Sequence, residues 1–311
     1  MTAKLVVLGV NPAWQKILRF EQLAVGKVNR AVKLTEFASG KGVNFCRAAI
    51  VAGKASPVLI QAAGGDAGKR LVEYLTREKM TVETVPAGPT RVCVSCCEPD
   101  GRCTELIEPS TALTAEQAAA LLRAFDAHLR DAGMAAFCGS LPDGSDGAFY
   151  RHAADLAAAR RVPLLLDTVK DLPELLDRAY RAVVKINREE LAKVTGESSV
   201  DSGLARLFQH PSLEFAAITD GPEQATAATR ERRWTFAMPV LDHILSPIGC
   251  GDTCGAVMAG ELLAGARPED AFTAGLAAAS ANCLTELYGD FRPEDAAKIR
   301  AGIRTVEVTA K

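Results

Sequence analysis

Short, uninterrupted apolar runs recur along the first two thirds of the chain, separated by segments with helical periodicity. Strands that are buried on both faces of a parallel sheet have this uniformly apolar character. The runs before Asn11 and at 57–61, 134–138, 162–167, 182–186 and 215–219 are the predicted strands. The segments 67–79, 114–131, 145–160 and 200–209 are the predicted helices, and Thr114 with Gln117 has capping-box spacing at the start of one. The pattern predicts a layered α/β fold with a parallel sheet.

Two regions break this rhythm. Residues 14–37 alternate apolar and polar positions, and residues 91–108 look like two strands joined by a Pro-Asp-Gly turn. We expect these regions to form a small β layer outside the main sheet, placed as a lid. From residue 251 onward the sequence predicts mostly helix. Repeats and linker-like segments are missing from the sequence, so 1–311 is interpreted as one domain.

Composition excludes several classes of function. The 311 residues contain 36 Lys+Arg against 38 Asp+Glu, so a basic surface for nucleic acid is not expected. Neither a signal-peptide core nor the ~20 apolar residues of a membrane span is present. Nine cysteines without a secretory signal favour free thiols and a cytoplasmic location. Cys93 and Cys96 have zinc-like spacing, but in a strand they point to opposite faces, so no metal site is predicted there.

The segment SPIGCGDTCG, residues 246–255, raises a question about Asp252. Gly249 and Gly251 leave the backbone open before a helix, so its N–H groups and the helix dipole can bind an anion such as phosphate. The simplest interpretation of Asp252 is an ordinary helix-start residue. The alternative is that its carboxylate accepts a proton from a hydroxyl that attacks a bound phosphoryl group.

Two further segments carry candidate chemistry. Gly40, Lys41, Gly42 and Asn44 form either an ordinary turn or a substrate loop that allows close approach, and their spacing differs from that of a P-loop. Asn187 is a natural helix cap, but with Glu190 on the same face it could also hold the waters of Mg²⁺. The dinucleotide fingerprint G-x-G-x-x-G does not follow the first strand.

Together these motifs resemble the ribokinase-like carbohydrate kinases, specifically the phosphofructokinase B group and its 1-phosphofructokinase/tagatose-6-phosphate kinase branch. The resemblance covers nearly the whole chain and rests on motifs in a characteristic order. They are NPA (11–13), GKVNR (26–30), GKGVN (40–44), GGDAG (64–68), TR (90–91), EP (108–109), GSLP (139–142), LDT (166–168), KINREE (185–190) and GCGDT (249–253). The resemblance implies a three-layer fold, a small β-sheet lid over the sugar, and homodimerisation through that lid.

The resemblance also implies roles for the residues at the catalytic end. Asp252 would be the catalytic base, and the amides of Gly249, Cys250 and Gly251 would form the anion hole. Asn187 and Glu190 would organise Mg²⁺. Nucleotide contacts would come from Lys185, Asn187, Thr219 and Gly221.

The resemblance also implies substrate-binding residues, and at this end the chain departs from the usual residues of the branch. The substrate-binding positions are Asn11, Gln15, Lys27, Gly40, Lys41, Gly42, Asn44, Arg91 and Ser140, of which Lys27, Arg91 and Ser140 would hold the substrate's phosphate. The branch usually has an Asp where this chain has Gln15, a Lys where it has Glu105 and an Asn where it has Ile107.

Several functions therefore stay open at this point. The first is ATP- and Mg²⁺-dependent phosphorylation of fructose 1-phosphate to the 1,6-bisphosphate. The second keeps the fold but uses tagatose 6-phosphate, fructose 6-phosphate, an unphosphorylated sugar or a nucleoside. A non-catalytic sugar-binding regulator is a third. A dinucleotide-dependent oxidoreductase is a fourth, which protection by NAD rather than ATP would reveal.

Overall fold

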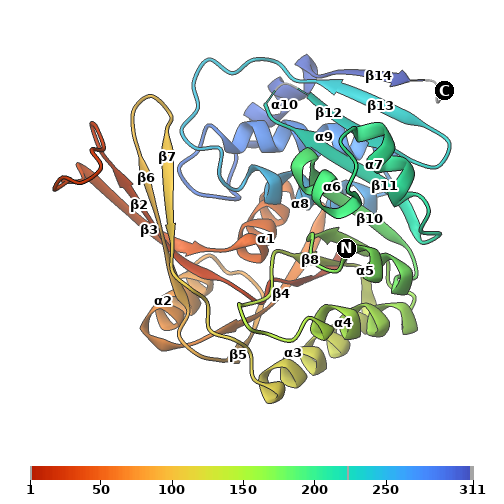
Figure 1. The fold of residues 1–311 in the computed structure, drawn as a ribbon, viewed down its shortest axis with the longest axis horizontal. Helices are drawn as coiled ribbons and strands as arrows, with labels where there is room; N and C mark the ends of the chain where they lie inside the picture. Colours follow the sequence, from red (N-terminus) through yellow and green to blue (C-terminus); the bar gives the residue numbers. More distant parts are fainter. Residues whose placement is uncertain (1, 223, 309–311) are drawn as a thin grey trace.

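A long central sheet and a small separate sheet organise the chain (Figure 1). The computed structural model describes residues 2–222 and 224–308. Over these residues the central sheet has ten strands in the order β14-β13-β12-β11-β10-β9-β8-β1-β4-β5. Its strands are β1 (Ala3–Leu8), β4 (Ala55–Ala63), β5 (Val82–Pro86), β8 (Ala132–Cys138), β9 (Leu164–Asp167), β10 (Ala182–Asn187), β11 (Leu213–Asp220), β12 (Gln224–Ala228), β13 (Arg233–Ala237) and β14 (Arg304–Val308). The seven strands from β11 to β5 are parallel, and the last three are added antiparallel.

Helices cover both faces of this sheet, which confirms the predicted layered α/β fold. Successive side chains of β1 point to opposite faces of the sheet, and both faces are buried. Leu5 and Val7 lie in one hydrophobic core, while Val6 and Leu8 lie in the other. The first core is covered by α1 (Lys41–Ala52), α2 (Gly65–Arg77), α8 (Cys250–Leu263), α9 (Pro268–Asn282) and α10 (Pro293–Gly302). The second is covered by α3 (Ala115–His128), α4 (Ala148–Ala159), α5 (Leu172–Arg178), α6 (Arg188–Thr195) and α7 (Val200–Leu207). In the described part of the chain, no helix is both long and apolar enough to cross a bilayer.

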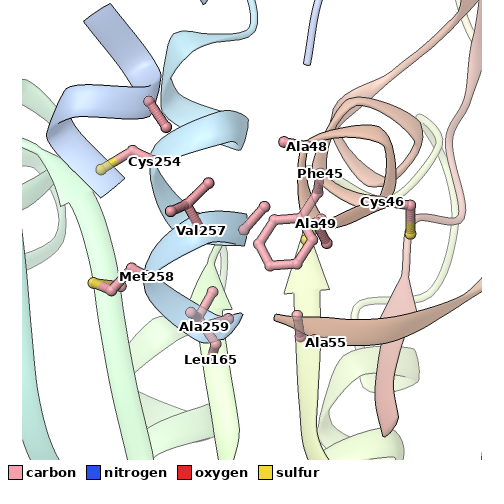
Figure 2. Close-up of a cluster of buried hydrophobic side chains, with 14 of the residues drawn as sticks. Phe45, Cys46, Ala48, Ala49, Ala55, Leu165, Cys254, Val257, Met258 and Ala259 are labelled. Carbon is pink, nitrogen blue, oxygen red and sulfur yellow. The ribbon is translucent and has the colours of Figure 1, made fainter. Parts of the chain in front are cut away.

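Small residues let α1 and α8 pack closely. Figure 2 shows the Phe45 ring of α1 directed toward α8, among Ala49, Val257 and Ala259. A Cβ on Gly255 would lie 3.2 Å from that ring, so glycine is what permits this spacing. The packing brings the first turns of both helices together at the carboxyl edge of the parallel strands, where ligands bind in open α/β sheets.

The small sheet stands at one side of the central sheet (Figure 1). Its strands are β2 (Ala13–Arg19), β3 (Lys33–Ser39), β6 (Arg91–Cys97) and β7 (Cys103–Ile107), so the predicted β layer in 14–37 and 91–108 is present. The β2–β3 and β6–β7 pairs are antiparallel, and β2–β6 is parallel.

The C-terminal region is mostly helical, as predicted, but it also contains a strand that the sequence pattern did not indicate. After α8, α9 and α10, residues 304–308 form β14, which pairs antiparallel with β13 at the edge of the central sheet. This strand is short and exposed throughout, so burial leaves no apolar signature in its sequence. Strands β5, β12 and β13 and helix α5 were not predicted either. The three strands mix apolar and polar residues and so lack a continuous apolar run, and α5 has only seven residues.

Candidate active site

A cavity of about 450 Å³ lies between the small sheet and the carboxyl edge of the central sheet. We call it the first cavity. Most of the predicted site residues line it, although they are far apart in the sequence. These residues are Gln15, Gly40, Lys41, Asn44, Arg91, Lys185, Asn187, Glu190, Thr219, Gly249, Gly251 and Asp252.

Other predicted residues lie outside the first cavity. Lys27 is in the exposed loop between β2 and β3, and Ser140 is exposed beyond the end of β8. Gly42 packs inward instead, since a Cβ there would lie 2.5 Å from the Cα of Gly9. Asn11 contributes its carbonyl, which accepts a hydrogen bond of 3.4 Å from Nη2 of Arg91. The remaining two, Cys250 and Gly221, line a second cavity described below.

The first turn of α8 leaves backbone amides open toward its N-terminus. Gly249 caps the helix in the left-handed region, with φ of 85°, and its carbonyl accepts the first intrahelical bond from the Thr253 amide at 2.9 Å. The amides of the preceding helical residues therefore have no acceptor inside the helix. A Cβ on Gly249 would lie 2.9 Å from the Cβ of Tyr288, which makes glycine necessary at this position.

Lys185 adds a positive charge at the same turn. A Cβ on Gly251 would lie 2.8 Å from its Nζ, so the ammonium group occupies the space beside this glycine. Open amides, a helix N-terminus and a buried ammonium group together favour a phosphate or phosphoryl group.

Asp252 is a buried carboxylate held in one orientation. It is 6% exposed, and its Oδ2 accepts a hydrogen bond of 2.8 Å from Nδ2 of Asn44. Ser39 donates to Oδ1 of Asn44 at 3.0 Å and so fixes which way the amide points. Burial, reinforced by the charge of Asp167, raises the pKa of Asp252 to about 6. The group is therefore ionised at neutral pH but more basic than an ordinary aspartate.

Asp167 lies between two lysines and was missed as a site residue. Its carboxylate is 3.3 Å from Nζ of Lys41 and 3.7 Å from Nζ of Lys185. Burial opposes the charge on Asp167, but both lysines outweigh it and hold its pKa below the usual value. The charge of Asp167 raises the pKa of Lys41. Burial opposes the charge of Lys185, but Asp167 together with Cys254 and Asp252 raises its pKa above the usual value. Both lysines are thus kept charged beside Asp252. The sequence feature that could have identified Asp167 as a site residue is its position at the end of a buried parallel strand.

Asn187 and Glu190 lie together at the start of α6, as their spacing predicts. They form a capping box at the start of α6, in which each side chain accepts from the other's amide at 2.8 Å. Both also line the first cavity. The capping bonds use Oδ1 of Asn187 and Oε2 of Glu190, which leaves the second carboxylate oxygen for a ligand. Among the described residues, no group of three or more His, Cys, Asp or Glu could hold a metal directly. One free carboxylate oxygen and one amide fit a hydrated Mg²⁺ held through its waters.

A polar network crosses the inner face of the small sheet. The Ser95 hydroxyl accepts hydrogen bonds of 2.9 Å from Nε2 of Gln15 and from the Tyr288 hydroxyl, and donates to Glu105 at 3.5 Å. Gln15 is only 3% exposed and also donates to the Lys16 carbonyl. Glu105, which the family resemblance places at the substrate end where the branch usually has a Lys, is a carboxylate in the wall of the first cavity.

Arg91 is the cation on this wall. Its Nε is buried and has no hydrogen-bond partner within the described residues. Its guanidinium group also lacks a carboxylate partner there, since only the Asn11 carbonyl accepts from it. An unpartnered buried donor on a permanently charged group points to an anionic ligand.

The second cavity, of about 860 Å³, adjoins the first through Thr219 and Gly251. Its wall is largely apolar and includes Met238, Val240, Leu241, Ile244 and Leu276. A flat, apolar ring system fits such a wall. A nucleotide with its base here and its phosphates toward Gly251 would reach the first turn of α8.

The chain is similar to known proteins over most of its length. The model of the pfkB family carbohydrate kinases matches residues 11–294. The phosphofructokinase-2 of Escherichia coli in complex with substrates and products has a TM-score of 0.85 at 22% identity, covering 96% of this chain and 99% of that one. A Thermotoga maritima protein described as a possible 1-phosphofructokinase has a TM-score of 0.84 at 21% identity, covering 98% and 100%. At these identities the two structures show a shared fold.

Proposed function

The chain belongs to the pfkB family of carbohydrate kinases, and we propose that it uses ATP and Mg²⁺ to phosphorylate a hydroxyl of a ketohexose phosphate. The simplest substrate is fructose 1-phosphate, which would give fructose 1,6-bisphosphate. The observation that carries the proposal is the position of Asp252, whose oriented carboxylate lies in the same helical turn as the open amides of α8. We further propose that residues 1–311 act as one domain in the cytoplasm.

The transfer step follows from this arrangement. A substrate hydroxyl near Asp252 would give its proton to the carboxylate as its oxygen attacks the γ-phosphoryl group. The amides of Cys250 and Gly251, the Gly249 turn and the Lys185 ammonium group would stabilise the charge on the transferred group. Because these donors are already in place, little reorganisation is needed during the reaction.

The base of ATP would lie in the second cavity, with Thr219 and Gly251 at the junction. Asn187 and Glu190 would hold Mg²⁺ through its waters. When bound, Mg²⁺ supplies positive charge that neutralises the phosphate oxygens. The small sheet would act as the lid that keeps water from the first cavity.

Arg91 supports a substrate that already carries a phosphate, because its unpartnered Nε needs an anion. Lys27 does not line the first cavity of this chain, but in a dimer formed through the lid it could contact the substrate bound to the partner. Large apolar side chains are exposed on the small sheet and its β2–β3 loop. They are Val25, Val28, Val32, Leu34 and Leu106. This surface supports a homodimer formed through the lid.

A second candidate keeps the reaction but changes the acceptor to an unphosphorylated sugar or a nucleoside, whereas tagatose 6-phosphate and fructose 6-phosphate are ketohexose phosphates and belong to the first candidate. Glu105 favours it, because a carboxylate in the cavity wall accepts hydrogen bonds from hydroxyls and repels phosphate. The deciding experiment measures ADP release with Mg-ATP for fructose 1-phosphate, fructose 6-phosphate, tagatose 6-phosphate, fructose, ribose and a nucleoside. Glu105→Gln is the matched variant. Preference for a ketohexose phosphate supports the first candidate, and turnover only with neutral acceptors that weakens in Glu105→Gln supports the second.

A further inference from the structure

Two cysteine thiols face each other where α8 begins and α9 ends. Cys250 is the first residue of α8, and Cys283 caps the C-terminus of α9. Their sulfur atoms are 3.1 Å apart. A disulfide has an S–S distance of about 2.05 Å, so a relative movement of about 1 Å would bring the sulfurs to bonding distance.

The backbone that carries these thiols is held on both sides. The Thr253 hydroxyl lies 2.9 Å from the Gly249 carbonyl and 2.9 Å from Oδ1 of Asn282, which ties the turn before Cys250 to the end of α9. The Leu245 amide donates to the Cys283 carbonyl at 2.7 Å. These bonds keep the two sulfurs adjacent in the folded chain.

Solvent and small molecules can reach the pair. Both residues are partly exposed and line the second cavity. By contrast, Cys46 and Cys138 are buried in the core and line neither cavity. The hydrogen bond between the two thiols outweighs burial and lowers the pKa of Cys283, which favours the reactive thiolate.

We propose that Cys250 and Cys283 are a peroxide-sensitive dithiol whose disulfide inactivates the nucleotide site. One thiolate attacks hydrogen peroxide, breaks the O–O bond, and becomes a sulfenic acid with release of hydroxide. The second thiol attacks that sulfur, forms the S–S bond and releases water. Two thiols thus lose two electrons in total, and one peroxide is reduced to two waters.

The expected consequence rests on the proposed function, because Cys250 belongs to the anion-binding turn. Closing the bond would draw this residue toward α9 and move the amides of Cys250 and Gly251. A misplacement of about 1 Å in a catalytic group can reduce turnover by about 100-fold. ATP in the second cavity should cover the pair and slow its oxidation.

The test treats the full chain with hydrogen peroxide, with and without Mg-ATP, then blocks free thiols and maps disulfides by peptide mass spectrometry. We expect a Cys250–Cys283 cross-link and at least a 10-fold loss of activity, both reversed by dithiothreitol and slowed by Mg-ATP. In Cys283→Ser, the activity after peroxide treatment divided by the activity of the reduced protein should stay near one. Cys97→Ser is the matched control, since Cys97 lies opposite Cys103 in the small sheet, and it should remain sensitive.

Peptide maps without a Cys250–Cys283 cross-link would overturn the proposal, as would equal inactivation of Cys283→Ser. The map does not depend on turnover. If no acceptor is phosphorylated, the thermal shift caused by Mg-ATP replaces activity as the second readout. Failure of the proposed function is therefore distinguishable from failure of the dithiol.

Discussion

Replacing Asp252 by Asn should abolish turnover and also stabilise the folded chain. Asn can still accept the hydrogen bond that Asn44 donates, but it carries no charge into the buried site. Folding raises the pKa of Asp252 from 3.8 to about 6. Because the unfolded chain holds the ionised form more easily, this shift corresponds to an unfavourable contribution of about 3 kcal/mol.

Because ionisation of Asp252 opposes folding, its unfavourable contribution to stability increases with pH. Above about pH 6 the carboxylate is ionised in both states, and the full penalty applies. It falls to about half at pH 5 and disappears below pH 4, where the group is protonated in both states. We therefore expect Asp252→Asn to gain about 3 kcal/mol at pH 8. For 311 residues this corresponds to a rise in Tm of about 4–5 °C.

The assay is denaturant unfolding of the nucleotide-free chain between pH 5 and pH 8. Asp66→Asn is the matched control, since Asp66 lies in the first turn of α2 but its side chain is 93% exposed. That variant should lose up to about 1 kcal/mol of favourable dipole interaction. Unchanged or reduced stability of Asp252→Asn at pH 8, or a gain that does not vary with pH, would refute the reasoning.

Three further outcomes are expected. The kcat/KM of the wild type should fall about tenfold per pH unit below about pH 6 as Asp252 is protonated; in Asn44→Leu the midpoint should move upward, whereas a midpoint set by the substrate's own phosphate would not move. Arg91→Met should raise the KM for the sugar phosphate by about 10- to 100-fold and leave the KM for ATP unchanged in steady-state kinetics; equal effects on both would contradict its assignment to the sugar. Asp167→Asn should destabilise the chain by about 3–5 kcal/mol in urea unfolding, because Lys185 would keep a buried charge without its partner; a loss below 1 kcal/mol would show that the pair is not needed.

Local sequence patterns predicted most of the parallel strands and the glycine-rich turn that begins α8. Strands of the parallel core are buried on both faces, so their apolar runs are visible without knowledge of their neighbours. Gly249, Gly251 and Asp252 are close in sequence, and their chemistry depends on one helical turn. The edge strand β14 lacked such a signal because neither of its faces is buried.

Long-range placement was harder to predict. Asn44 and Asp252 are 208 positions apart, and only the packing of α1 on α8 brings them together. Asp167 was visible at the end of a strand, but its role depends on two lysines from separate elements. Lys27 shows the opposite case: its motif matched the family, yet its loop carries it away from the cavity of its own chain.

The central claim is that Asp252 is the base for phosphoryl transfer to a sugar hydroxyl. The most direct test compares the kcat of the wild type and Asp252→Asn with Mg-ATP and the best acceptor, while the affinity for ATP is measured by calorimetry. We expect kcat to fall by about 100-fold or more with nearly unchanged ATP affinity, because the base is lost and the amides of α8 remain. Turnover close to the wild type in Asp252→Asn would contradict the account.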